Sequence, residues 1–514
     1  MNGVVVWAEV VAVLFALAQI LYFLTFLVDA YFFGLPTDAV DMHEPITEPE
    51  SEWPYVVLFY PVLRELEATM RTTMLSLSHM DYPAQRYRVI AIPNSSDRET
   101  IASLRRLTGE FAFLEILEIP PTSDPSWEIV WNAWDANPKT YWWHQGKRAG
   151  VKDLPPKKTR QLVYAFYRTA ADLAARNERN VVINYIDADS CPPRDHFKAA
   201  VIGLKHYDVL QAENVAGNLN ATMFASWHAF DHMAWDGYKY AHLSSHGRQP
   251  YWLLGKGLFY KASDLLELGG FHPWITIEDP EVGMRFWANG KRLGILRSSL
   301  IEEVPETWWR GVIQRKRWVC GFFQSLARPL RYLGLTPIQR FKCRLIFLPC
   351  LSLWINALGI PTGIWALVTY FKHDDILPVW VVTLACLNLA LFVTSMSALY
   401  VNTWRRTGLV LNRWQERVSY MLRVNPVFVV LWWVLWLVPL AIGLGMYLRD
   451  EGLVWERTEK IDANNLLVRA QLRREARTPD AAVIRGEIPA GSTEGSVVGP
   501  PWETAAEEER EIKP

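Results

Sequence analysis

The chain has 514 residues, of which half are hydrophobic and 21% are charged. Its 53 basic and 54 acidic side chains give a net charge of −1, which excludes a nucleic-acid binder that works by bulk attraction to phosphate. The chain is too apolar to be disordered and too charged to lie wholly within a membrane. Length and composition therefore favour several units, in which membrane-spanning helices are joined to a soluble domain.

Cysteine and tryptophan usage narrows the classes further. The five cysteines are few, odd in number and not at zinc-binding spacing, so neither a disulfide framework nor a structural metal site is predicted. The 25 tryptophans outnumber the 22 phenylalanines. Because a buried indole needs a stacking platform and a partner for its N–H, this excess favours sugar binding or a membrane interface.

The chain begins with a long apolar segment, from about Val10 to Phe33, whose one charged side chain is Asp29. No basic region precedes it, since the first Lys or Arg of the chain is Arg64, and the apolar run is longer than that of a signal peptide. We therefore expect a retained transmembrane anchor over residues 1–33.

Three later segments contain no Asp, Glu, Lys or Arg and are long enough to span a membrane: Leu345–Phe371, Leu377–Val401 and Pro426–Leu448. We assign them to three transmembrane helices over 345–448, with buried core helices as the alternative. Basic residues crowd 306–344 and the loop 402–425, so the positive-inside rule puts this loop and the globular domain in the cytosol of a plasma membrane or its equivalent. Four crossings then leave the charged, partly disordered tail, 449–514, outside.

The region between the anchor and the later spans alternates between strand and helix patterns. Strands are predicted at Tyr55–Tyr60, Tyr87–Ile92 and Val181–Ile186, and helices at Glu65–His79 and Leu162–Arg176. This order predicts an α/β domain with a parallel sheet covered by helices on both faces. Ligands of such sheets bind beyond the carboxyl ends of the strands, so the residues that follow each strand are the candidates for a site.

The third strand is followed by Asp187-Ala188-Asp189. Two carboxylates in this spacing at a strand end can share one hard cation with a bound diphosphate. Mg²⁺ or Mn²⁺ suits this arrangement, because Mg²⁺ usually takes one or two carboxylates plus substrate phosphates. A solvated loop is the alternative.

A second acidic pair, Glu278-Asp279, stands between Ile277 and Pro280. Adjacent carboxylates in a partly apolar setting have raised pKa values, which suits a general base. The alternative is the start of a helix, where the helix dipole favours acidic side chains.

A third cluster is Gln314-Arg315-Lys316-Arg317-Trp318, in which Gln314, Arg317 and Trp318 share one helical face. An amide, a guanidinium and an indole together suit a pyrophosphate leaving group beside a sugar ring. The alternative is a basic amphipathic helix on the membrane surface, a role open to Arg315 and Lys316 on the other face.

Taken in order, a strand with Asp-x-Asp, Glu-Asp and Gln-x-x-Arg-Trp, followed by membrane helices, resembles the inverting family-2 glycosyltransferases. Within them it is similar to the membrane-embedded cellulose, chitin and hyaluronan synthases. Further short matches, each weak but collinear, are Pro61–Glu65, Asp81–Pro83, Lys158–Leu162, Gly255–Tyr260 and Leu268–Phe271. The resemblance implies a GT-A-like (Rossmann-like) glycosyltransferase domain over 34–305 and amphipathic interface helices over 306–344, beside the transmembrane α-helices.

Two parts of the chain depart from the pattern of this family. The second strand of the family ends in a carboxylate that touches the nucleotide, whereas here Asn94 follows that strand and Asp97 comes three residues later. We expect both to lie near the nucleotide, with Asn94 able to hydrogen-bond a uracil. The Trp-rich insertion Trp127–Lys157 has no counterpart in the resemblance.

The resemblance also implies a role for each candidate residue. Asp279 acts as general base, with Glu278 as the alternative. Asp189 and Asp187 hold Mg²⁺ or Mn²⁺, and Lys158 offsets charge on the departing diphosphate. Gln314, Arg317 and Trp318 cap the site, with Trp318 stacking near the acceptor sugar.

The expected function is that of an inverting hexosyltransferase which moves a sugar from a nucleotide-sugar, expected to be a UDP-sugar, to a growing β-linked polysaccharide. The Gln-x-x-Arg-Trp motif together with the Trp-rich insertion favours a longer sugar acceptor. One alternative is transfer of a single sugar to a membrane lipid, because four helices are few for a secretion channel without self-association or a secretion partner. Another is a non-catalytic membrane scaffold, which would suit Asn94 and also Arg64, since the family has an Asn at the position of Arg64.

Overall fold

The structure is a computed structural model that describes residues 2–32, 35–178, 180–328, 330–346, 348–372, 377–451 and 460–475. The chain divides into two units, Met1–Val468 and Arg469–Pro514. The second unit is described over 469–475, the end of a helix that begins at Asn465. All of the candidate site residues belong to the first unit.

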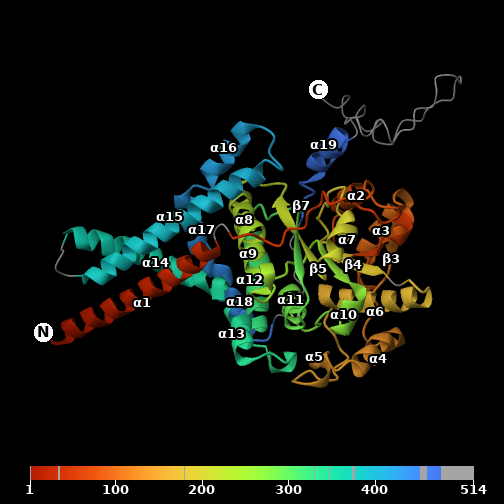
Figure 1. Ribbon diagram of the computed structural model, residues 1–514, viewed down its shortest axis with the longest axis horizontal. Coiled ribbons are helices and arrows are strands. Elements are labelled where there is room, and N and C mark those ends of the chain that lie inside the picture. Colours follow the sequence, from red (N-terminus) through yellow and green to blue (C-terminus); the bar gives the residue numbers. More distant parts are fainter. Residues whose placement is uncertain are drawn as a thin grey trace. The chain divides into compact units, whose positions relative to one another are not determined.

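A seven-stranded sheet with the order β3-β2-β1-β4-β6-β5-β7 forms the centre of the first unit (Figure 1). Its strands are β1 (Tyr55–Tyr60), β2 (Tyr87–Ala91), β3 (Leu114–Ile116), β4 (Val181–Tyr185), β5 (Val209–Ala216), β6 (Leu258–Lys261) and β7 (Leu293–Glu302). The three predicted strands are confirmed as β1, β2 and β4, to within one residue at each end.

The sheet is mixed, whereas the sequence pattern predicts a parallel one. β6 runs antiparallel to both of its neighbours, β4 and β5, and the remaining pairs are parallel. The prediction is wrong here because it rests on three strands that alternate with helices. β6 has four residues and follows a long helical excursion, so no local pattern sets its direction.

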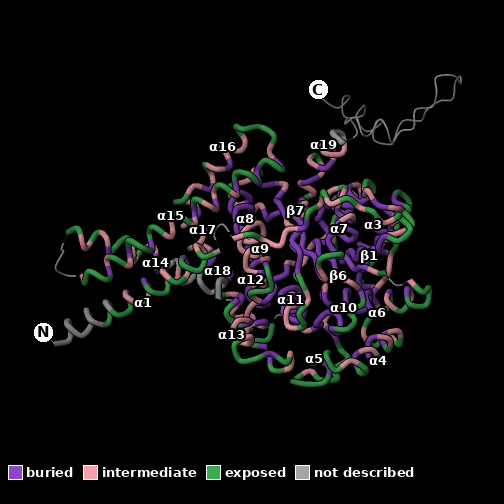
Figure 2. The backbone as a smooth tube through the Cα atoms, viewed as in Figure 1, coloured by how far each residue is buried: buried purple, intermediate pink, exposed green. Residues whose placement is uncertain are grey.

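Helices cover both faces of the sheet. The α-helices are α1 (Asn2–Phe32), α2 (Glu67–Leu77), α3 (Arg98–Glu110), α4 (Glu128–Ala136), α5 (Tyr141–His144), α6 (Lys158–Ala175), α7 (Lys198–Ile202), α8 (Met223–Ala234), α9 (Tyr240–Ser244), α10 (Ala262–Glu267), α11 (Asp279–Ala288), α12 (Trp308–Leu326), α13 (Pro337–Leu345), α14 (Leu348–Lys372), α15 (Val379–Thr407), α16 (Trp414–Arg423), α17 (Pro426–Leu435), α18 (Leu437–Leu448) and α19 (Asn465–Glu475). Alternate residues of β1 point to opposite faces: Val57 and Phe59 pack with α4, α6 and α11, and Val56 and Leu58 pack with α2, α3 and α7. Figure 2 shows this buried core around the strands.

The Trp-rich insertion is part of the core. Its five indoles are between 0% and 7% exposed: Trp127, Trp131, Trp134, Trp142 and Trp143. They stack on one another, with ring centroids of Trp131 and Trp143 5.2 Å apart and nearly parallel. Because the rings are buried among themselves, they offer no platform for a sugar, and the insertion no longer favours a long sugar acceptor.

Three segments of the described chain are long and apolar enough to span a membrane: Val13–Tyr31, Val379–Thr407 and Pro426–Leu448. The fourth predicted span, Leu345–Phe371, falls on α14, some of whose side chains lie outside the described residues, and it stays a prediction. α1, α14 and α15 contact one another and extend together away from the sheet (Figure 1). Within them, buried Asn388 donates to Gln19 Oε1 at 2.7 Å.

The segment formed by α17 and α18 contacts the sheet domain near both of its ends. Just before α17, Arg423 donates to the carbonyl of Asn220 at 2.8 Å, and just after α18, Asp450 pairs with Arg148 at 3.0 Å. Residues 460–468 then continue along the sheet domain. The number of crossings and the side of the membrane on which the tail lies stay predictions.

A buried ion pair connects α12 to α8, α17 and α18. Arg315 is 1% exposed, and its Nη2 donates to Asp231 Oδ2 at 2.9 Å. The same oxygen accepts the indole N–H of Trp432 at 2.8 Å and of Trp436 at 2.7 Å. The amphipathic alternative places Arg315 on the membrane surface. The structure instead buries Arg315 inside the protein, where Asp231 compensates its charge.

We expect Asp231→Asn to lower the free energy of unfolding by about 3–5 kcal/mol, because it leaves the buried guanidinium of Arg315 without a counter-charge. Thermal or denaturant unfolding of the full chain in detergent measures this loss. The control is Glu118→Gln, which breaks the solvent-exposed pair with Arg105 and should change stability by about 0–1 kcal/mol. Equal effects of the two changes would contradict the stabilising role of the buried ion pair between Arg315 and Asp231.

Candidate active site

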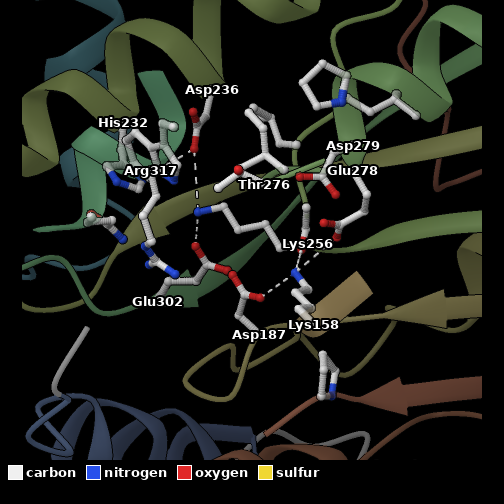
Figure 3. Close-up of a pocket in the computed structure, with 18 of the residues that line it drawn as sticks. Lys158, Asp187, His232, Asp236, Lys256, Thr276, Glu278, Asp279, Glu302 and Arg317 are labelled. Atoms are coloured by element: carbon white, nitrogen blue, oxygen red, sulfur yellow. Dashed lines mark hydrogen bonds and ion pairs between the residues drawn. The ribbon is translucent and has the colours of Figure 1, made fainter. Parts of the chain in front are cut away.

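A cavity lies beyond the carboxyl ends of β1, β4 and β7 (Figure 3). Its wall is made by the residues after these strands, the starts of α6 and α11, the end of α8, one face of α12 and Trp436, which lies between α17 and α18. It brings together eight of the residues predicted from the sequence: Lys158, Asp187, Asp189, Glu278, Asp279, Gln314, Arg317 and Trp318.

The other two predicted residues are not among the described residues that line the cavity. Asn94 is 2% exposed and accepts a hydrogen bond from Arg160 Nη2 at 2.5 Å. Asp97 caps the N-terminus of α3 by accepting from Thr100, and it also accepts from the backbone N–H of Arg64 at 2.7 Å. Their contact with a nucleotide stays a prediction.

The Asp-x-Asp segment forms a tight turn directly after β4. Ser190 N–H donates to the carbonyl of Asp187 at 3.0 Å, and the next residue, Cys191, pairs with Ile301 of β7. The two carboxylates face different surroundings. Asp189 is buried and accepts from the backbone N–H of Glu303 at 2.8 Å, whereas the side chain of Asp187 is 44% exposed. Asp187 is therefore the more open carboxylate of the two.

Lys158 joins the two acidic clusters. Its ammonium group donates to Asp187 Oδ1 at 2.8 Å and to the carbonyl of Gly255 at 2.9 Å, and lies 3.6 Å from Glu278 Oε1. Burial by itself would lower the pKa of Lys158, but the negative charges of Asp187, Glu278 and Asp279 outweigh it and raise the pKa above its ordinary value. Lys158 is therefore a fixed positive charge between the clusters.

Asp279 is the first residue of α11 and is 9% exposed. Its Oδ1 accepts a hydrogen bond from the hydroxyl group of Tyr185 at 2.5 Å. Burial, and then the neighbouring charge of Glu278, raises the pKa of Asp279 well above its ordinary value. A raised pKa makes the carboxylate a stronger proton acceptor, which is what a general base requires.

Gly255 leaves the space that Asp279 occupies. A Cβ at this position would lie 2.5 Å from Asp279 Oδ2 and 2.8 Å from Oδ1. These distances are shorter than a van der Waals contact, so the carboxylate can hold its position only because residue 255 has no side chain.

The described wall of the cavity carries more acidic than basic side chains. The acidic ones are Glu65, Asp187, Asp189, Asp231, Asp236, Glu278, Asp279, Glu302 and Glu303, and the basic ones are Lys157, Lys158, Lys256, Arg317 and Lys460. Burial, followed by the charges of Asp189 and Asp187, raises the pKa of Glu302 to about 7, which relieves part of this excess. The negative charge of a diphosphate would still be repelled by the remaining acidic side chains unless a cation were bound with it.

The donor set fits such a cation. Within the described residues no group of three or more His, Cys, Asp and Glu side chains is arranged as a complete metal site. The turn instead offers two carboxylates, one of them open, which matches the way Mg²⁺ is held by one or two carboxylates and substrate phosphates.

One face of α12 closes the cavity. Gln314, Arg317 and Trp318 line it, as their spacing predicts, while Arg315 points away to Asp231. The buried Oε1 of Gln314 has no hydrogen-bond partner among the described residues. This amide oxygen, which lies on the same helical face as a guanidinium and an indole, is able to accept a hydrogen bond from a polar ligand.

Several lining residues were missed by the sequence reasoning. Lys256 pairs with Glu302, lies 3.7 Å from Asp236, and stands between two glycines that were noted only as a family match. His232 and Lys460 lie far from any motif. Lys460 donates to Asp189 Oδ2 at 2.5 Å from a position after the last apolar helix, and no local signal predicts that contact.

The sequence profile described as Glycosyl transferase family group 2 matches residues 182–448, which is more than half of the chain. The chain belongs to this family. The matched span runs from β4 and the Asp-x-Asp turn to the end of α18, so it contains both acidic clusters and the Gln-x-x-Arg-Trp helix. The protein is thus a family-2 glycosyltransferase with a mixed, GT-A-like α/β sheet and apolar helices.

Solved structures with a similar arrangement have low sequence identity. A mannosyltransferase of Pyrobaculum calidifontis, in complex with GDP-Man and Mn²⁺, is 16% identical, with a TM-score of 0.47 over 86% of this chain and 99% of that one. TarS of S. aureus is 12% identical (TM-score 0.32, 57% and 42%). Glucosyl-3-phosphoglycerate synthase of Mycobacterium tuberculosis is also 12% identical (TM-score 0.31, 59% and 89%). No curated protein matches this glycosyltransferase.

We expect Gly255→Ala to reduce turnover by about 10²-fold, because a displacement of about 1 Å at a reacting group can cost this much. The added methyl group meets the carboxylate of Asp279 and must move it. Steady-state turnover with the donor identified by screening measures the loss. Gly109→Ala is the control, since a Cβ there meets nothing within 4 Å, and it should keep full activity. Wild-type turnover in Gly255→Ala would contradict this role of Gly255.

Proposed function

We propose that this glycosyltransferase is a membrane-bound, inverting hexosyltransferase that moves a sugar from a nucleotide-sugar, expected to be a UDP-sugar, to a growing β-linked polysaccharide. The observation that carries the proposal is the meeting of three clusters in one cavity. Lys158 bridges Asp187 to Glu278, next to Asp279, and the amide, guanidinium and indole of α12 face them. These intact clusters also argue against a non-catalytic scaffold.

The proposed step is a single displacement. Asp279 removes the proton of the acceptor hydroxyl, whose oxygen forms a bond to the anomeric carbon while the bond to the diphosphate breaks. The raised pKa of Asp279 suits the proton transfer, and Tyr185 fixes the carboxylate. Glu278 raises that pKa and is the alternative base. One displacement inverts an α-linked donor to a β-linked product without a covalent intermediate.

We further propose that Asp189 and Asp187 hold Mg²⁺ or Mn²⁺, which stabilises charge on the leaving diphosphate when it is bound. The acidic excess of the cavity wall supports this requirement. Lys158 and Arg317 offset the remaining charge of the diphosphate, and Gln314 and Trp318 contact the sugars. Asp187 pairs with Lys158 and Asp189 pairs with Lys460, and these ion pairs help to hold the turn.

A membrane lipid is the second candidate acceptor. The cavity reaches Trp436, which lies in the apolar segment Pro426–Leu448, so an acceptor could enter from the bilayer. The two candidate acceptors, a polysaccharide and a lipid, can be distinguished by incubating membranes with radiolabelled UDP-glucose, UDP-N-acetylglucosamine and GDP-mannose. A large, solvent-insoluble product supports the polysaccharide. A product that extracts into organic solvent supports the lipid, and no incorporation from any donor overturns the transferase.

We propose the following organisation for the chain. Residues 1–33 anchor it, 34–305 form the catalytic domain, 306–344 form the interface helices, and 345–448 contain the remaining apolar helices with the Arg-rich loop 402–425. The catalytic domain lies in the cytosol, because nucleotide-sugars are cytosolic and the basic flanks follow the positive-inside rule. We also expect self-association or a secretion partner if the product crosses the membrane.

We expect Asp279→Asn and Asp189→Asn to fail in different ways. Asp279→Asn should lose about 10²–10⁴-fold in turnover, as for loss of a general base, with nucleotide affinity changed by no more than about three-fold. Asp189→Asn removes a metal ligand and should weaken binding of the nucleoside diphosphate itself. Turnover assays and a UDP titration in Mn²⁺ on each variant separate the two losses.

The acid side of the pH profile provides a further check on this prediction. Turnover of the wild type should fall as pH drops through the raised pKa of Asp279, that is, above the ordinary value of 3.8. Asp172→Asn, on the outer side of α6, is the control and should behave as the wild type. If Glu278→Gln is inactive and Asp279→Asn is active, the base is Glu278.

Orientation can be tested by labelling in intact cells. Ser96 is exposed beside the cavity end of β2, so Ser96→Cys should be unlabelled by an impermeant maleimide until the cells are lysed. Cys386 is exposed and should first be replaced by Ser. A Cys at Asp374, in the short loop expected outside, is the positive control. Labelling at position 96 in intact cells would reverse the proposed orientation.

A further inference from the structure

Across the cavity from Asp279, α8 continues into a π-helical turn over Trp235–Lys239 and then into α9. π-Turns are rare within helices and are frequent at functional sites. This one begins three residues after His232 and carries Asp236, and both side chains line the cavity. Figure 3 shows the two residues together on one side of Lys256, with Glu278 and Asp279 on the other.

The two side chains form a carboxylate–imidazole pair. Nδ1 of His232 lies 3.3 Å from Oδ2 of Asp236, and both side chains are at least nine-tenths buried, with exposed fractions of 8% and 9%. The second ring nitrogen of His232, Nε2, is buried without a hydrogen-bond partner among the described residues. A carboxylate that accepts the Nδ1 proton leaves Nε2 as an acceptor.

Burial and the nearby positive charge of Lys256 favour the neutral form of the His232 ring. Burial lowers the pKa of His232 below its ordinary value, the positive charge of Lys256 acts in the same direction, and Asp236 opposes both. Lys256 in turn contacts Glu302, so Asp236 belongs to a chain of ion pairs that ends beside the Asp-x-Asp turn. A neutral imidazole at the far end of this chain can accept a hydrogen bond from an alcohol.

The cavity wall that contains His232 also carries aromatic rings. The rings of His232 and Trp318 have centroids 6.1 Å apart and planes inclined by 62°. The same stretch of wall contains Trp235, Trp252 and Trp436. A sugar ring matches such a surface, because its apolar face can stack on an indole while its hydroxyl groups point sideways to a polar atom.

We propose that His232, positioned by Asp236, accepts a hydrogen bond from a ring hydroxyl of the acceptor sugar that stacks near Trp318. His232 is thus an acceptor-binding residue, and Asp279 remains the base. This inference rests on the proposed transferase function and deepens it: the acceptor presents a sugar ring at this subsite, so a lipid acceptor would have to carry a sugar already.

The test uses the full chain in nanodiscs with UDP and Mn²⁺, and the sugar probes are cellobiose and N,N′-diacetylchitobiose. His232→Asn keeps a donor near Asp236 but removes the distal nitrogen, and should weaken binding of the better probe about ten-fold, as for the loss of one hydrogen bond. His232→Gln can place an amide atom near the Nε2 position and should weaken it less. UDP affinity should change less than about two-fold in both variants, since the donor end is separate.

His242→Asn is the matched control, because His242 bonds the carbonyl of Tyr238 and does not belong to the described wall of the cavity. It should bind both probes as the wild type does. The proposal is overturned if the wild type binds neither probe, if His232→Asn binds them unchanged, or if UDP affinity falls in parallel with sugar affinity. Loss of sugar binding in a chain that transfers from no donor would support the subsite and refute the transferase.

Discussion

A single ammonium group, that of Lys158, connects the parts of the catalytic site. It contacts Asp187 at the end of β4, Glu278 before α11 and the carbonyl of Gly255 before β6. Lys158 is the first residue of α6, a position where the helix dipole disfavours a cation, so its stability there depends on the acidic side chains. The carboxylates in turn depend on Lys158, because without it they would face one another unscreened.

This arrangement gathers more negative than positive side chains, which repel one another but are also suited to binding a cation and to removing a proton. Carboxylates at the ends of β4 and β7 and at the start of α11 converge where the strands end, and burial raises the pKa values of Asp279 and Glu302. Lys158, Lys256 and Lys460 offset part of this charge. The remainder suits a divalent cation that arrives with a diphosphate, and a base whose proton affinity has been increased by burial.

Helix α12 links the catalytic cavity to the apolar helices. Its Arg315 points to Asp231, Trp432 and Trp436 and is buried, while Arg317, two residues later, lines the cavity. Helical periodicity alone separates these two roles, since side chains two residues apart face different directions. Two neighbouring residues of α8 also have different roles. Asp231 pairs with Arg315, whereas His232 faces the proposed acceptor.

The sequence by itself determined the strands β1, β2 and β4, the position of Asp187 after a strand, and the placing of Asp279 beside a helix start and of Trp318 on one helical face. These features follow from local hydrophobic period and from the rule that ligands bind where parallel strands end. Tertiary structure alone decided the direction of β6, the burial of the Trp-rich insertion and the arrival of His232, Lys256 and Lys460 at the cavity. The reason is physical: which buried charges meet depends on contacts between residues far apart in the chain, and no local pattern records them.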